Sequence, residues 1–109
     1  MAQHEFGIME EAPRPGQRFD RYEPEKYGCT AVEDPMMDPL LPALRELKVY
    51  WHTVDAPGRG IEENGVTLIP PESISEMLAV MEGREGLERL ERLLRAARRN
   101  GKYVIHFGI

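Results

Sequence analysis

A chain of 109 residues, 41% hydrophobic and 30% charged, is long enough for one modest hydrophobic core and lies outside the composition of disordered proteins. Its single cysteine, Cys29, excludes an internal disulfide and a zinc site built from thiolates, and favours a reducing cytoplasm. A net charge of −5 argues against general nucleic-acid binding, and no apolar run approaches the roughly 18 residues that cross a bilayer. We therefore expect a cytoplasmic protein that has no metal or other cofactor and does not enter a membrane.

The first 26 residues show neither helical nor strand periodicity. Pro13, Pro15 and Pro24 lie among scattered charges and aromatic side chains, and proline restricts the backbone and removes a hydrogen-bond donor. The sequence therefore predicts an extended proline-rich arm over residues 1–26. A single α+β domain is expected over residues 27–109.

The domain begins with a predicted strand and a short helix. Residues 27–34 alternate in the manner of a strand, with Cys29 as a small buried hydrophobe. Asp34-Pro35 and Asp38-Pro39 both resemble a helix start, and the later one is preferred because Pro42 fits only a first turn. The buried stripe of that helix comprises Leu40, Leu44 and Leu47.

Two further strands are expected in the middle of the chain. Residues 48–54 are rich in aromatic and β-branched side chains, and residues 66–71 form a strand stopped by two prolines. The loop 55–65 joins them as a hairpin with a decorated end. Asn64-Gly65 forms either a tight turn or a bulge in it, and the residues alone do not decide between these.

Two helices and a last strand complete the pattern. An apolar stripe over residues 73–82 predicts one helix, and leucines at helical spacing over residues 84–102 predict the next. The alternating apolar residues of 102–109 predict a strand. The resulting fold class is α+β: a four-stranded antiparallel sheet with helices on one face, on a ferredoxin-like βαββαβ plan whose second helix is doubled. Its last strand lies at an edge, beside the strand at 27–34.

That edge position predicts self-association. An apolar strand with unpaired backbone groups invites another strand, so we expect a homo-oligomer, most simply a homodimer, formed through 102–109 or the open face of the sheet. The arm could instead cover the same edge within one chain and leave a monomer.

The charge of the chain is unevenly distributed. Residues 84–102 hold seven basic and three acidic residues, a net charge of +4, so the rest of the chain carries −9. Three favourable i,i+4 pairs account for part of this pattern: Glu85–Arg89, Glu88–Arg92 and Glu91–Arg95. A nucleic-acid patch would use the bases at the end of the segment, but no aromatic side chain is interleaved for base stacking.

Four stretches carry a resemblance. They read YEPEKYGC (22–29), YWHT (50–53), GVTLIPPES (65–73) and KYVIHFGI (102–109), and they resemble stretches of a group of small bacterial proteins with no assigned activity. The resemblance implies a bacterial origin and one compact domain. It transfers no catalytic residue to this chain.

The candidate binding residues lie at the end of the second predicted strand and in the following loop. They are Tyr50, His52, Asp55, Arg59 and Glu62. Loops held by a rigid scaffold carry function disproportionately, but the glycines of this loop lack the spacing of a phosphate loop. No pair of histidines has metal-ligand spacing, and Cys29 has no neighbour in the sequence that would activate it.

Two classes of function follow from these residues. The chain favours a non-enzymatic protein-interaction or regulatory module, because no catalytic set of residues is recognisable. The alternative is a small enzyme or ligand-binding domain that uses the open sheet face around His52 and the 55–65 loop.

Overall fold

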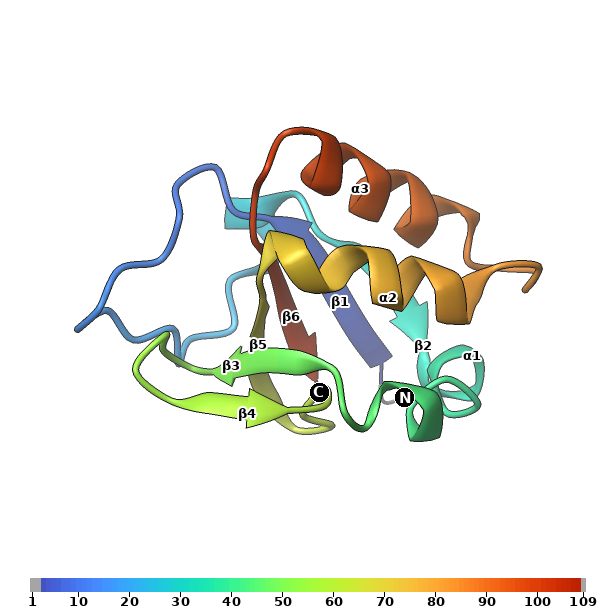
Figure 1. The fold of residues 1–109 in the computed structure, drawn as a ribbon, viewed down its shortest axis with the longest axis horizontal. Coiled ribbons are helices and arrows are strands. Elements are labelled where there is room, and N and C mark those ends of the chain that lie inside the picture. The colour runs from blue at the N-terminus through green and yellow to red at the C-terminus, as the bar shows by residue number, and fades with distance from the viewer. Residues whose placement is uncertain (1–2, 109) are drawn as a thin grey trace.

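A computed structural model describes residues 3–108 of the chain. Six antiparallel strands form one sheet in the order β2-β1-β6-β5-β3-β4, and α2 and α3 cover one of its faces (Figure 1). The strands are β1 (Gln3–Ile8), β2 (Thr30–Glu33), β3 (Lys48–Trp51), β4 (Pro57–Arg59), β5 (Gly65–Ile69) and β6 (Val104–Gly108). The helices are α1 (Asp34–Met37), α2 (Pro71–Met81) and α3 (Glu88–Arg99), with short 3₁₀ turns η1 (Pro24–Tyr27) and η2 (Pro42–Leu44).

The chain is an α+β protein, but the predicted four-stranded βαββαβ sheet is wrong. Two of the six strands were not expected: β4 lies in the predicted loop, and β1 lies in the segment predicted as an arm. β1 is a strand because His4, Phe6 and Ile8 alternate toward the helices, where Phe6 is fully buried. It pairs with β2 on one side and β6 on the other.

The last strand, β6, lies in the interior of the sheet and not at its edge. His106 of β6 is opposite Phe6 of β1 and also opposite Thr67 of β5. The predicted pairing of this strand with the strand at 27–34 is therefore wrong, because residues 3–8 lie between them. Its residues 104–108 offer no free edge to a second chain, so the basis for self-association through this strand disappears, and the oligomeric state stays a prediction.

The chain between β2 and β5 also differs from expectation. Helix α1 begins at Asp34, the earlier of the two candidate starts, and Pro42 begins the separate turn η2 because proline donates no backbone hydrogen bond to a continuing helix. β5 pairs with β3 and not with the preceding residues 61–63. The hairpin is instead formed by β3 and β4.

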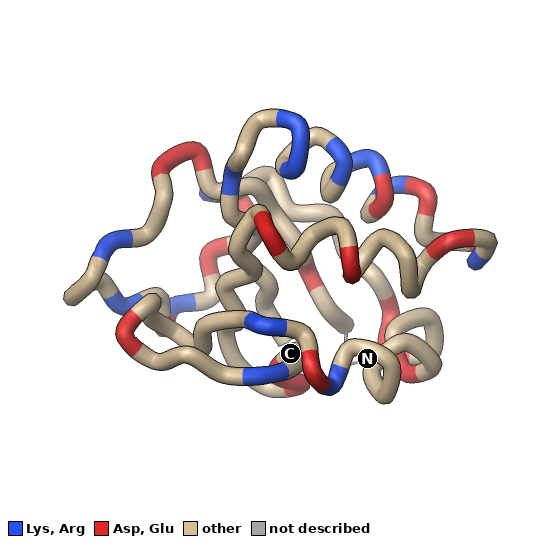
Figure 2. Tube along the Cα trace, in the orientation of Figure 1, with Lys and Arg blue, Asp and Glu red and all other residues tan. Residues whose placement is uncertain are grey.

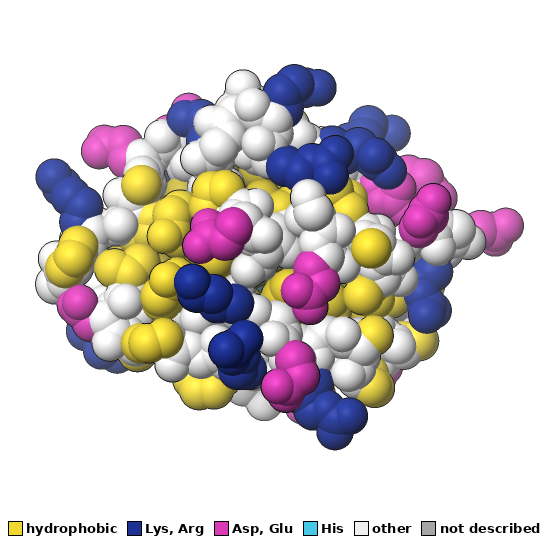
Figure 3. Space-filling view, viewed as in Figure 1, with side chains coloured by type: hydrophobic (Ala, Val, Ile, Leu, Met, Phe, Trp, Pro, Cys, Tyr) yellow, Lys and Arg dark blue, Asp and Glu magenta, His cyan; other side chains and the backbone are white. Residues whose placement is uncertain are grey.

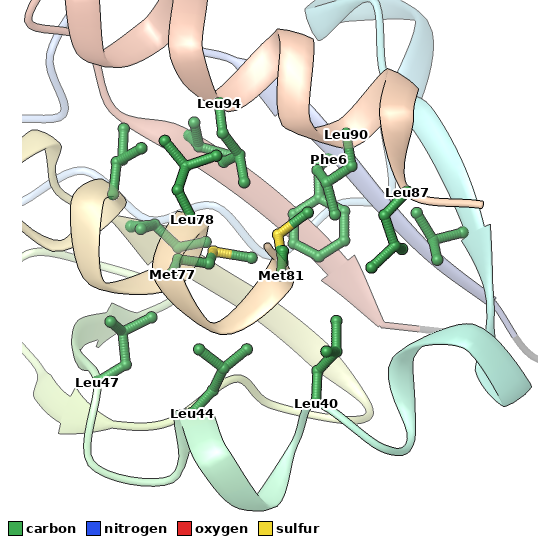
Figure 4. Packing of buried hydrophobic residues seen from close by; sticks show 14 of the residues in the cluster. Phe6, Leu40, Leu44, Leu47, Met77, Leu78, Met81, Leu87, Leu90 and Leu94 are labelled. Carbon is green, nitrogen blue, oxygen red and sulfur yellow. The ribbon is translucent and has the colours of Figure 1, made fainter. Parts of the chain in front are cut away.

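The main hydrophobic core lies between the sheet and the two long helices. Figure 4 shows Phe6 of β1 beneath Leu90, with the methionines of α2 beside it. The predicted stripe Leu40, Leu44 and Leu47 is fully buried and closes the core below α2. Burial of side chains of this size contributes about 1.5–3 kcal/mol each relative to exposure.

The opposite face of the sheet is covered by the segment between β1 and β2. We call residues 9–29 the arm loop. Beneath it, Ile105, Phe107 and Leu68 form a second buried cluster, against which Phe19 and Tyr27 of the arm loop pack. The sheet face that was predicted to be open is therefore covered by the chain's own residues. No helix within residues 3–108 combines the length and apolar character needed to cross a membrane.

Candidate functional site

His52 stands at the end of β3 in an unusual backbone conformation. Its φ is 64°, the only positive value among the non-glycine residues that the structure describes. Its N–H donates to the carbonyl of Val66 at 3.0 Å, and its own carbonyl accepts from the N–H of Phe19 at 2.8 Å. Left-handed backbone at a side-chain-bearing residue costs on the order of 1 kcal/mol and marks positions that the surrounding structure holds in place.

Two carboxylates flank the His52 ring. Glu62 Oε2 lies 3.4 Å from Nε2, and Asp20 Oδ1 of the arm loop lies 2.8 Å from Nδ1, although the latter contact does not have the geometry of a hydrogen bond. The Arg18 side chain, bonded to Asp20 at 2.9 Å, lowers the pKa of that carboxyl, and His52 adds to this effect. Gly65 leaves the space for this cluster, since a Cβ there would lie 2.6 Å from Glu62 Oε2.

The structure brings together only two of the five candidate binding residues, His52 and Glu62. Tyr50 packs near Tyr103 on the arm-loop face, with ring centroids 6.5 Å apart. Asp55 accepts a hydrogen bond from the N–H of Gly16 at 2.7 Å. Arg59 lies on the outer strand β4, where it donates to the carbonyl of Glu46 at 3.3 Å.

The His52 cluster is better explained as an attachment point for the arm loop than as a reaction site. The hollow beside it, lined in part by Tyr22, Val66 and Phe107, has a volume of about 140 Å³, below the roughly 300 Å³ at which ligand pockets usually begin. Asp20 and Phe19 of the arm loop contact His52, and Gly16 of the arm loop donates to Asp55. Asp20, which sequence reasoning missed, lies 32 positions away in the chain, and no local pattern could pair it with His52.

A second histidine cluster is buried at the junction of β1 and β6. His4 Nδ1 lies 2.7 Å from His106 Nε2, and His4 Nε2 lies 3.2 Å from Asp34 Oδ1. His106 is fully buried and His4 is 2% exposed. Burial lowers the pKa of both rings, most strongly that of His106, whose pKa the neighbouring His4 lowers further.

One arrangement of protons fits the geometry of this cluster. Nε2 of His4 faces the negatively charged Asp34 carboxylate, which favours a proton on Nε2 and makes Nδ1 of a neutral His4 an acceptor. His106 must then donate from Nε2, which leaves its Nδ1 as an acceptor; this atom is buried and has no partner among the described residues. Both rings are thus neutral and joined by one hydrogen bond, with the Asp34 carboxylate beside His4.

The thiol of Cys29 has no catalytic surroundings. Burial raises its pKa to about 12, and Glu5 and Glu25 contribute to the increase. Within residues 3–108, no three histidine, cysteine or acidic side chains converge as metal ligands. Cys29 is half-buried against the arm-loop face of the sheet.

We expect Cys29 to react slowly with Ellman's reagent at pH 8 while the protein is folded. With a pKa of about 12, almost none of the thiol is thiolate, the reactive form. Unfolding in urea should accelerate the reaction by at least about a hundredfold. Stopped-flow absorbance at 412 nm measures both rates, and equal rates in the two states would contradict the pKa shift.

Positively charged side chains are concentrated on the outer surface of α3. Figure 2 shows Lys and Arg along this helix, and Figure 3 shows their side chains gathered over it. Leu90, Leu94 and Ala97 face the core. Five arginines of α3 are exposed, and we call three of them that lie on the side away from the core, Arg92, Arg95 and Arg99, the α3 arginine face.

The predicted ion pairs along this helix are mostly absent from the described structure. Only Arg95 pairs, with Glu91 at 3.5 Å. Glu88 turns back to accept from the N–H of Gly86 at 3.1 Å and so does not pair with Arg92. The helix begins at Glu88, which leaves Glu85 outside the regular spacing. Within residues 3–108, Arg92 and Arg99 therefore make no ion pair.

No protein-family model, curated protein or solved structure matches this chain. Its function is therefore argued from these clusters and surfaces alone.

Proposed function

We propose that this chain is a small cytoplasmic protein-interaction module that binds an acidic segment of a partner protein through the α3 arginine face. The observation that carries the proposal is that Arg92 and Arg99 are exposed and make no ion pair within the described chain, while Arg95 has one weak pair. Arginine side chains bind carboxylates through two parallel hydrogen bonds. Arg92 to Arg99 spans about 10 Å of helix, a length suited to several acidic side chains in sequence.

The charge around the face favours a protein partner over nucleic acid. Glu88 lies on the same side of the helix as Arg92, and Glu91 lies beside Arg95. A uniformly negative phosphate backbone would be repelled by these acids, whereas a protein can place its own acidic and neutral side chains to match them. The chain's net charge of −5 acts in the same direction.

Fluorescence anisotropy with a labelled glutamate-rich peptide tests the proposal. Replacing Arg92, Arg95 and Arg99 with glutamate should weaken binding by at least about tenfold, or about 1.4 kcal/mol. A matched control changes Arg45, Lys48 and Arg59 to glutamate, which alters the net charge equally at exposed positions on other elements. We expect the control to bind within about threefold of the wild type.

Three results would contradict this function. Equal losses in the two triple variants would show that only the overall charge matters. Tighter binding of a single-stranded oligothymidine than of the peptide would assign the face to nucleic acid. If the peptide did not bind at low ionic strength, where exposed charges attract most strongly, the α3 arginine face would not be a site for acidic segments.

A further inference from the structure

The arm loop forms half-open pockets as well as covering the sheet. Two adjoining cavities of about 390 Å³ and 250 Å³ lie along it, and they share walls formed by Gln17, Phe19, Lys26 and Tyr27. We call this pair of cavities the arm hollow. Together they fall within the size range of small-molecule sites.

The arm loop is held at defined points around this hollow. The N–H of Met9 donates to the carbonyl of Tyr103 at 2.9 Å, and Lys102 Nζ reaches the carbonyl of Glu10 at 2.9 Å. Further along, Gly16 is bonded to Asp55, and Phe19 to His52. The hollow therefore lies between fixed points and does not depend on the chance position of a free loop.

The inner surface of the hollow is part polar and part apolar, and aromatic side chains form much of its apolar part. Phe19 and Tyr27 belong to both cavities, Met9 lines one, and Ile105 of the central strand β6 closes the other. Met9 and Ile105 are buried, whereas Phe19 and Tyr27 are half-buried. A flat apolar group can be buried against this surface at about 25 cal/mol per Å².

Unpaired cations surround that apolar surface. Lys26 borders both cavities, and its Nζ lies 5.6 Å from the centre of the Tyr27 ring. Arg14 borders one cavity and Arg21 the other, and within residues 3–108 these three side chains make no ion pair.

The carboxylates that border the hollow are partly engaged elsewhere. Glu10 pairs with Lys102 at 3.3 Å, and Asp20 pairs with Arg18 at 2.9 Å. Only Glu11 and Glu23 are left to oppose the three cations. Electrostatic attraction therefore selects an anion for the polar end of a ligand, and the apolar walls select its body.

We propose that the arm hollow binds a small amphipathic anion, an aromatic carboxylate, with its ring against Phe19 and Tyr27 and its carboxylate at Lys26. This site is separate from the α3 arginine face and does not rest on the protein-interaction function. Because Arg14 and Lys26 belong to opposite limbs of the arm loop, a bound anion also joins the two limbs.

Three naphthalene derivatives with the same ring and different charge test the site. Titration with 1-naphthoate, 1-naphthalenemethanol and 1-naphthylmethylammonium is followed by amide chemical shifts in two-dimensional NMR. We expect the anion to bind most tightly, and its shift changes to concentrate in residues 9–29 and 103–105. Lys26→Gln should weaken naphthoate by up to about fivefold, the loss of one exposed ion pair, and leave the neutral alcohol unchanged.

The control is Arg45→Gln, which removes an equal charge from an exposed position outside both the arm hollow and the α3 arginine face and should bind naphthoate as the wild type does. Equal affinity for all three compounds would show hydrophobic adsorption without charge selection and would overturn the proposal. Shift changes centred on the helices, or no change up to about 5 mM naphthoate, would also overturn it. The amide spectrum of Lys26→Gln without ligand verifies that its fold is intact, so a loss confined to this variant reports on the site.

Discussion

Replacing Phe6 with alanine should lower the free energy of unfolding by about 3–5 kcal/mol, a large share of the total stability of a domain this size. Phe6 is fully buried in the main core, and its strand β1 is paired on both sides. The truncated side chain leaves a cavity beneath α3 that rigid neighbours on the sheet cannot close. Urea unfolding followed by far-ultraviolet circular dichroism measures the loss.

Phe19→Ala is the matched control for this prediction. The same atoms are removed, but Phe19 lies in the arm loop and is only half-buried, so we expect a loss of about 1–2 kcal/mol. If Phe6→Ala were as mild as Phe19→Ala, β1 would not be an integral strand. The sequence-based view of residues 1–26 as an arm would then be the better description.

The wrong prediction for residues 3–8 shows which part of the fold local sequence patterns do not predict. His4, Phe6 and Ile8 do alternate with Gln3, Glu5 and Gly7, but the run is short and is followed by prolines and charges. Its stability as a strand comes from β6, about 100 residues later in the chain. Tertiary packing decides a pairing between strands so far apart in the chain, and strand propensity predicts such a pairing poorly.

The elements that were predicted well are those whose evidence is local. The leucine spacing that predicts α3 and the apolar stripe of α2 need no information from elsewhere, and the strands β3, β5 and β6 carry their own alternation. The order of these strands was wrong for a related reason. Inserting β1 beside β6 moved the last strand from the edge to the interior without changing any local pattern.

The candidate site shows the same division. His52 and Glu62 lie near each other in sequence and do meet, whereas Asp20 joins them only because the arm loop crosses the sheet. Arg59 was grouped with them by proximity in the chain, but β4 carries it to the opposite edge of the sheet from β2. The arm hollow could not be foreseen at all, because its walls come from β1, the arm loop and β6.

The buried histidine pair leads to the second large effect: the protein should lose stability as the pH falls below about 6.5. The pKa of His4 and of His106 is lower in the folded chain than the ordinary value of 6.5. Below that value the unfolded chain binds more protons than the folded one. Acid therefore favours unfolding, by about 1.4 kcal/mol per pH unit for each histidine in this window.

The charged groups around the pair oppose this loss without removing it. Asp34, Asp38 and Glu63 favour the protonated form of His4, but the effect of burial is larger. Helix α3 directs only apolar side chains toward the sheet. Protonation of either ring would break the single hydrogen bond between His4 and His106 or place a proton on the partnerless Nδ1 of His106.

Urea unfolding at pH 7.5 and pH 5.5 measures the effect, with two variants as references. His52→Asn removes a half-exposed histidine, and asparagine tolerates its left-handed backbone, so the acid-induced loss should persist. The double variant His4→Leu with His106→Leu removes both buried rings without leaving one unpaired, and its stability should differ little between the two pH values. Glu5 acts in the opposite sense: burial raises its pKa above 4.5, so its contribution to stability declines as the pH rises through that raised value.

A wild type as stable at pH 5.5 as at pH 7.5 would show that the histidine pair is not held neutral. Nitrogen-15 NMR of the rings, which reports the proton on each nitrogen directly, would then find a protonated ring.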